Sequence, residues 1–129
     1  MGVHELRVAV TAEDYEEALR FYRDVLGLRE VAAFSGRGRV TILEAGRATL
    51  ELLEPEHAEF VDEVEVGRRV AGHVRLAFEV DDAAGATRRL EGAGARVLAE
   101  PRETPWRSLN ARLEAPAGLQ LTLFQELDR

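Results

Sequence analysis

The stretch that decides the fold lies near the middle of the chain: Gly72-His73-Val74-Arg75-Leu76-Ala77-Phe78-Glu79-Val80-Asp81-Asp82. Its first part alternates apolar and polar residues, which is typical of a strand with one face on a core. The two aspartates that follow are suited to starting a helix. An earlier stretch, Glu5-Leu6-Arg7-Val8-Ala9-Val10, matches His73 to Phe78 position by position, and the pair that differs in kind is Glu5 against His73. The chain therefore contains a repeat.

Each copy of the repeat is followed by the same series of patterns. Apolar residues at helical spacing come first, and three short segments typical of strands come next. We expect the first helix to start at Thr11 and the second at Asp81 or Asp82. The predicted strands are Glu5–Val10, Leu28–Phe34, Arg39–Glu44, Ala48–Glu54, His73–Val80, Ala95–Ala99, Trp106–Glu114 and Leu119–Glu126. Each half thus has the predicted order strand, helix, strand, strand, strand.

The two units are predicted to span about residues 4–55 and 72–127 of a single domain. Residues 56–71 are short of strong core residues, so we expect a linker with one helical turn around Ala58 to Glu63. His57 falls in this linker and is expected to be exposed to solvent. A unit of this size buries too little surface to be stable alone, so the two must pair within one chain or between two chains. The predicted fold is α+β, with two paired βαβββ units forming a curved mixed sheet around a cleft.

Composition excludes several classes of function. The 129 residues carry a net charge of -7, which argues against a nucleic-acid surface because such a surface needs a basic footprint. There are no cysteines, so disulfides and thiolate metal sites are excluded. We find no signal peptide and no apolar run as long as a membrane span. These features favour a cytoplasmic protein that contacts neither nucleic acid nor membrane.

Strand alternation predicts which side chains line the cleft. If Leu6, Val8 and Val10 face a helix, their neighbours Glu5 and Arg7 face the other way. The same parity places His73 and Arg75, and on the last strand of each half Glu51 and Thr122, on the cleft side. Two carboxylates and an imidazole could hold a divalent metal. The alternative is a polar network in which Arg7 and Arg75 neutralise the glutamates.

Four parts of the chain resemble the vicinal oxygen chelate superfamily. This superfamily includes glyoxalase I, extradiol dioxygenases, fosfomycin-resistance enzymes and bleomycin-resistance binding proteins. The parts are Ala18-Leu19-Arg20-Phe21-Tyr22-Arg23-Asp24-Val25-Leu26-Gly27-Leu28, Leu50-Glu51-Leu52-Leu53-Glu54, Gly72 to Asp82, and Thr104-Pro105-Trp106. The resemblance covers nearly the whole chain and implies the glyoxalase/bleomycin-resistance fold.

The resemblance also implies where a metal would bind. The four positions fall on Glu5, Glu51, His73 and Thr122. Glu51 and His73 match the usual ligand types, whereas Glu5 stands where histidine or glutamine is usual and Thr122 where glutamate is usual. His4 is the competing ligand if the register slips by one. The candidate metal ligands are therefore Glu5, Glu51 and His73, and the candidate metals are zinc, nickel, manganese and iron.

These departures favour a binding protein over a metalloenzyme. The predicted function is to hold a small molecule in the cleft of a homodimer, as the resistance-type members do, with Arg7, Arg75, Trp106 and Thr122 contacting the ligand. Trp106 could stack on a planar ligand, or be an ordinary core residue. The alternative is a metal-dependent lyase, isomerase or dioxygenase that uses Glu5, Glu51 and His73.

Overall fold

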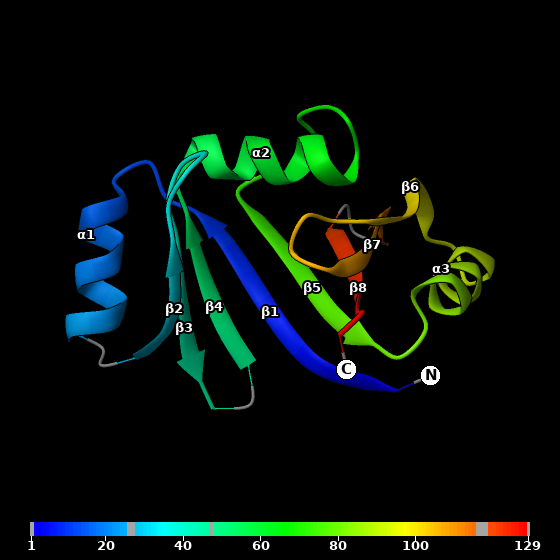
Figure 1. The fold of residues 1–129 in the computed structure, drawn as a ribbon, viewed down its shortest axis with the longest axis horizontal. Coiled ribbons are helices and arrows are strands. Elements are labelled where there is room, and N and C mark those ends of the chain that lie inside the picture. Colours follow the sequence, from blue (N-terminus) through cyan, green and yellow to red (C-terminus); the bar gives the residue numbers. More distant parts are fainter. Residues whose placement is uncertain (1, 26–27, 47, 116–118, 129) are drawn as a thin grey trace.

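A computed structural model describes residues 2–25, 28–46, 48–115 and 119–128. Eight strands form one mixed sheet in the order β2-β3-β4-β1-β5-β8-β7-β6 (Figure 1). The first half supplies β1 (Val3–Thr11), α1 (Tyr15–Leu19), β2 (Arg29–Phe34), β3 (Val40–Ala45) and β4 (Ala48–Leu53). After α2 (Pro55–Glu65), the second half supplies β5 (Val74–Val80), α3 (Ala83–Gly92), β6 (Arg96–Glu103), β7 (Ser108–Glu114) and β8 (Gln120–Glu126). This is the predicted α+β fold.

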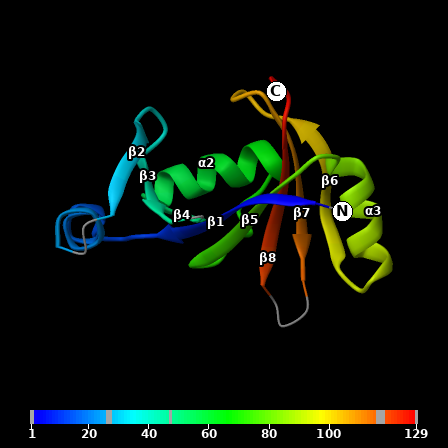
Figure 2. The same cartoon turned by 90° about the horizontal axis from the view of Figure 1, so that it is seen from below.

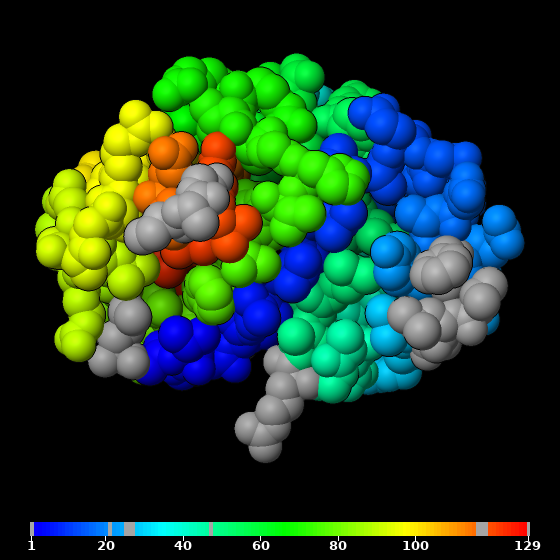
Figure 3. All heavy atoms as spheres, turned by 180° about the vertical axis from the view of Figure 1, so that it is seen from behind, coloured from blue at the N-terminus to red at the C-terminus, as the bar shows by residue number. Residues whose placement is uncertain are grey.

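The two halves meet in the middle of the sheet, where β1 runs antiparallel to β5 and Val8 lies directly opposite Leu76. These two residues are also equivalent in the sequence repeat, so the local two-fold axis passes between them. Outward from the axis, β1 pairs in parallel with β4, and β5 pairs in parallel with β8. Seen from behind, each half lies to its own side of the central strands (Figure 3). The halves therefore pair within one chain.

Helices α1 and α3 cover one face of the sheet, which we call the helix face. Tyr15 and Leu19 of α1 pack on Leu43 and Leu52, and a second core forms around α3. Both helices are capped by an aspartate, since Asp14 accepts from the Glu17 N–H and Asp82 from the Gly85 N–H.

The prediction that Thr11 starts the first helix is wrong. Thr11 is still part of β1, and its N–H donates to the carbonyl of His73. After α1 the chain continues as a π-helical segment, Arg20–Val25. Leu26 and Gly27 of the family-like stretch lie outside the described residues.

The opposite face, which we call the pocket face, is crossed by α2 (Figure 2). Ala58 of α2 packs with Ala9, Val40 and Leu53, whose parity along their strands is opposite to that of the helix-face residues. The segment expected to be a linker with one helical turn is therefore an eleven-residue helix. Pro55 stands at its first position, where the missing N–H has no helical partner to lose.

Two strands of the second half have other limits than predicted. β6 runs on to Glu103 instead of ending at Ala99, passing Pro101 where the register with β7 shifts. An edge strand tolerates proline at such an irregularity because no ladder hydrogen bond is needed there. β7 starts at Ser108, so Trp106 lies in the turn before it. In the described ranges no helix is long and apolar enough to cross a membrane.

Candidate functional site

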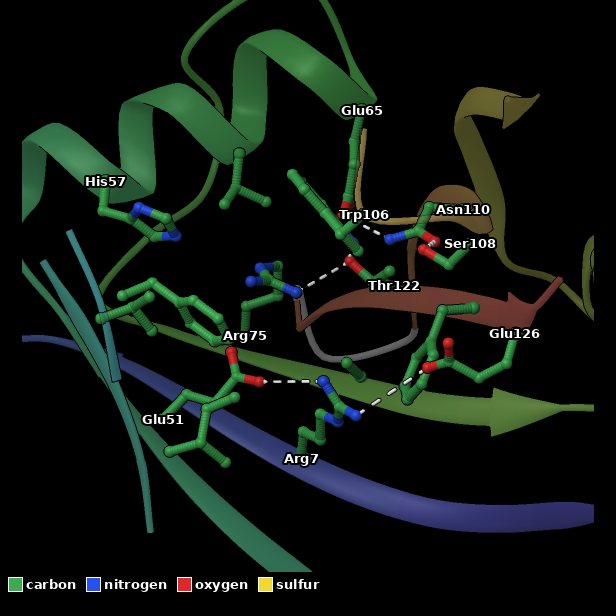
Figure 4. Close-up of a pocket in the computed structure, with 16 residues that line it drawn as sticks. Arg7, Glu51, His57, Glu65, Arg75, Trp106, Ser108, Asn110, Thr122 and Glu126 are labelled. Carbon is green, nitrogen blue, oxygen red and sulfur yellow. Dashed lines mark hydrogen bonds and ion pairs between the residues drawn. The ribbon is translucent and has the colours of Figure 1, made fainter. Parts of the chain in front are cut away.

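A cavity of about 180 Å³ lies between α2 and the pocket face. Sixteen side chains from both halves, from α2 and from the turn at Trp106 line it (Figure 4). Its walls combine apolar groups, such as Val40, Val61 and Phe124, with arginines and carboxylates. A small number of polar groups set in apolar walls is the usual composition of a small-molecule site.

Arg7 of β1 lines the cavity and has carboxylates around its guanidinium. Its Nε lies 2.9 Å from Glu5 Oε2 and its Nη1 lies 3.3 Å from Glu51 Oε2, while Glu126 is 4.0 Å from Nη2. The guanidinium also lies 4.6 Å from the centre of the Phe124 ring. Burial alone would lower the pKa of Arg7, but the carboxylates of Glu51 and Glu5 outweigh burial and raise it. The charge of Arg7 is thus balanced by carboxylates of the protein itself.

Arg75 of β5 also lines the cavity and has a different environment. It is 7% exposed, and its Nη1 donates to the hydroxyl of Thr122 at 2.9 Å. Within the described residues it has no carboxylate inside ion-pair distance. A buried cation whose hydrogen-bond partner is neutral is costly, because its lost hydration is poorly replaced. An anion entering the cavity would supply the missing partner.

A buried polar network attaches α2 to the second half. Arg112 of β7 is 0% exposed and donates to Glu65 Oε1 from Nε at 3.1 Å and from Nη2 at 3.0 Å. Its Nη1 donates to Asp62 Oδ1 at 2.8 Å. Thr122 connects this network to Arg75, since its hydroxyl donates to Glu65 Oε1 at 2.8 Å. The network fixes both the roof of the cavity and the hydroxyl that holds Arg75.

Asp62 is strongly held as a carboxylate. Burial would raise its pKa, but hydrogen bonds from the N–H groups of Ala71 and Val70 and from the side chains of Arg69 and Arg112 outweigh burial and lower it. The segment after α2 is thereby pinned to the helix. These hydrogen bonds explain how residues 66–71, with few apolar side chains, keep a defined position.

His57, on the first turn of α2, is half-buried and lines the cavity (Figure 4). Its Nδ1 lies 3.1 Å from the carbonyl oxygen of Arg37. Burial lowers the pKa of His57, and the nearby cations Arg75 and Arg37 act in the same direction. The hydrogen bond to the Arg37 carbonyl and the charge of Glu51 partly oppose this shift. The expectation that His57 is exposed in a linker is therefore wrong.

Trp106 lies at the mouth of the cavity and is 44% exposed. Thr104 holds the turn that carries it, because the Thr104 hydroxyl accepts from the Ser108 N–H at 3.2 Å. Arg107, next to Trp106, has a φ of 63°, in the left-handed region that side chains other than glycine rarely adopt. The centre of the Phe60 ring, on α2, lies 6.2 Å from the centre of the Trp106 ring. The indole is thus presented to the cavity by a constrained turn.

The structure gathers some of the predicted site residues and separates others. Arg7, Arg75, Trp106, Thr122 and Glu51 all line the cavity. The remaining predicted metal ligands lie elsewhere. Glu5 borders a neighbouring surface groove and is bound to Arg7, His73 is exposed just before β5, and the competing His4 is paired with Asp81.

The strand register explains why Glu5 and His73 do not meet. Glu5 lies opposite Glu79, which is six residues after His73, so Glu5 and His73 are about 20 Å apart along the strands. They are equivalent about the local axis, but each lies three residues from it on opposite sides. Among the described residues, no three histidine, aspartate or glutamate side chains form a group that could hold a metal ion.

Comparison with known proteins identifies the family. Residues 6–123 match the model of the Glyoxalase/Bleomycin resistance protein/Dioxygenase superfamily. The chain belongs to this superfamily. No curated protein sequence matches it.

Solved structures with the same superfamily fold are similar over nearly the whole chain. A hypothetical protein from Bacillus halodurans has a TM-score of 0.67 and 19% identity, with 97% of this chain and 94% of that chain covered. Methylmalonyl-CoA epimerase from Mycobacterium tuberculosis has a TM-score of 0.64 and 24% identity, with coverage of 97% and 87%. Another methylmalonyl-CoA epimerase, in complex with methylmalonyl-CoA and NH4+, has a TM-score of 0.64 and 22% identity, with coverage of 96% and 93%. At these identities the likeness concerns the fold.

The residues that the sequence resemblance assigns to the metal positions do not fit a divalent metal in this chain. Arg7 places a cation between Glu5 and Glu51, and Arg75 places a second cation on Thr122. A metal ion would have to compete with both guanidinium groups, and threonine is a poor ligand. The polar network that was the alternative to a metal site describes Arg7 and its glutamates, whereas in the described ranges Arg75 has no glutamate within ion-pair distance.

Sequence reasoning missed His57 and the acidic groups of α2. The spacing of Ala58, Val61, Asp62 and Glu65 after Pro55 is helical and could have indicated a longer helix. The signal was hidden because two of these four buried residues are acidic. Phe124 could have been found by parity, since it lies two residues after Thr122 on β8.

Proposed function

We propose that the protein binds a small organic acid in the cavity under α2, without a divalent metal. The observation that carries the proposal is Arg75, a buried guanidinium that faces the cavity and is bonded to a neutral hydroxyl. A carboxylate is the natural partner for such a group, because it can accept two parallel hydrogen bonds from the guanidinium. Trp106 supports a planar or apolar body on the same ligand, since its exposed ring stands at the mouth.

The other charges of the cavity support an acid bound at Arg75 rather than at Arg7. Glu51 and Glu126 are both drawn toward Arg7, and Glu65 is bound to Arg112. The carboxylates of the lining thus already have cationic partners. In this proposal the Arg75 guanidinium takes the place of a metal as the cationic group that receives the ligand.

The test compares Arg75→Gln with the wild type and with Arg96→Gln, which removes an exposed arginine on the β6 edge. Glutamine removes the buried charge and stays polar, so we expect the free energy of unfolding without ligand to stay the same or rise. Binding of benzoate and of methylmalonyl-CoA, the ligand of a structural neighbour, is then measured by calorimetry. At least one of these acids should bind the wild type and Arg96→Gln, with at least tenfold weaker binding to Arg75→Gln.

Two results would contradict this proposal. One is equal binding of the acids by the wild type and Arg75→Gln. The other is an Arg75→Gln protein that is much less stable than the wild type, because the arginine would then be a structural group. Adding a chelator to the wild type should leave acid binding unchanged.

The homodimer and the cytoplasmic location expected from the sequence remain predictions. Light scattering coupled to size-exclusion chromatography measures the mass of the particle and tests the homodimer. A mass of one chain at micromolar concentration would contradict it.

A further inference from the structure

The first turn of α2 is held in place from two sides. The N–H of His57 donates to the carbonyl of Glu54 at 3.0 Å, as in an ordinary helix start. The loop between β2 and β3 packs closely on this turn. A Cβ on Gly38 would lie only 2.5 Å from the backbone nitrogen of His57. The position of the imidazole at the cavity is therefore set by backbone contacts.

The hydrogen bond of Nδ1 determines which nitrogen of His57 carries the proton. A carbonyl oxygen can only accept, so Nδ1 must donate its hydrogen to the Arg37 carbonyl. In a neutral imidazole the other nitrogen, Nε2, is then an acceptor with a free lone pair. In the described part of the chain, Nδ1 is the ring nitrogen that has a hydrogen-bond partner and Nε2 has none.

The surroundings of His57 favour the neutral ring at pH 7. Burial lowers its pKa below the ordinary value of 6.5, and the cations of Arg75 on β5 and Arg37 on the neighbouring loop lower it further. Glu51 on β4 and the Arg37 carbonyl act in the opposite direction without reversing the shift. The cavity thus contains a cationic donor, Arg75, and a neutral acceptor, His57, on different elements.

We propose that His57 Nε2 accepts a hydrogen bond from the ligand, so that the cavity selects acids that also carry a hydroxyl or N–H donor, such as hydroxy acids. This inference rests on the proposed function, because it assumes that the acid group is bound by Arg75. His57 then acts as a specificity-determining residue, because a ligand without the donor leaves the acceptor nitrogen unpaired. Discrimination by a missing hydrogen bond is stronger than discrimination by shape alone.

The experiment uses benzoate and its three monohydroxy derivatives as probes, with calorimetry at pH 7.5. For the wild type, at least one hydroxybenzoate should bind about tenfold or more tightly than benzoate. His57→Phe keeps an aromatic ring and removes the acceptor, so the preference should fall to less than about twofold while benzoate still binds. His73→Phe, which changes an exposed histidine outside the cavity, should retain the preference.

The outcomes separate the two proposals. Equal binding of all four probes by the wild type, or a preference that survives in His57→Phe, would overturn the role of His57 and leave acid binding intact. Failure of all four, and of methylmalonyl-CoA, to bind the wild type at millimolar concentration would contradict acid binding itself.

The protonation of the His57 ring can also be measured on the wild-type protein, so this test does not depend on the folding of a variant. Nitrogen-15 NMR of the three histidines reports which ring nitrogen carries the proton. The His57 signal should show hydrogen on Nδ1, and hydrogen on Nε2 would refute the inference.

Discussion

Replacing Arg112 by methionine should be one of the most damaging single changes in the chain. The variant loses the two hydrogen bonds to Glu65 and the one to Asp62. Asp62 keeps the cation of Arg69 and two backbone N–H groups, whereas Glu65 keeps only the neutral groups of Asn110 and Thr122 among its partners in the described residues. One buried carboxylate is therefore left without a cation.

Removal of one partner from a buried ion pair costs about 3–5 kcal/mol. A domain of this kind has a total stability of roughly 5–15 kcal/mol, so Arg112→Met should lose a large part of it at pH 7. Urea unfolding followed by circular dichroism measures the loss. The double variant Arg112→Met with Glu65→Gln removes the orphaned charge and should recover at least half of it.

Arg96→Met provides the matched control, since Arg96 pairs with Glu114 on the exposed edge and should give no measurable loss. A loss below about 1 kcal/mol for Arg112→Met, or no recovery in the double variant, would show that the network does not hold α2 in the way described.

Three other predictions concern the cavity walls. In urea unfolding, Gly38→Ala should lower the free energy of unfolding by at least about 1 kcal/mol more than Gly46→Ala. Both glycines have a positive φ, but of the two only Gly38 has a neighbour that a Cβ would strike. Equal losses would contradict the close approach of the loop to α2. Because the pKa of His57 is lowered in the folded protein, its contribution to stability is complete above pH 6.5 and decreases as the pH falls through the folded-state pKa. Between pH 7.5 and 5 the wild type should therefore lose more stability than His57→Phe. Parallel pH profiles of the two proteins would contradict this. Thr104→Val should change the emission of Trp106, the one tryptophan, because the turn loses a buried hydroxyl bonded to the chain; an unchanged spectrum would count against that support.

The sequence predicted the architecture well because the repeat and the strand parity are local patterns. Val8 and Leu76, matched by the repeat, lie opposite each other in the sheet, and Glu51 and Thr122 share the cavity as parity requires. The position of the first helix could not be predicted, because Thr11 and Asp14 are both good capping residues. The choice between them is made by the hydrogen bond of Thr11 to His73, a residue from the other half of the chain.

The candidate site was predicted in part for a similar reason. Parity states which face a side chain occupies but not how far along the strand its partner lies. It therefore grouped Glu5 with His73, although the antiparallel register separates them. The role of α2 was hidden because Asp62 and Glu65 are buried as members of an ion-pair network, and hydropathy assigns such residues to the surface.

The helix α2 connects the two halves. Ala58 packs on the first half, while Asp62 and Glu65 are bound to Arg112 of the second. A hinge motion that separates the two halves would therefore expose the buried charges of Asp62, Glu65 and Arg112. A ligand therefore has to enter and leave the cavity with α2 still attached to both halves.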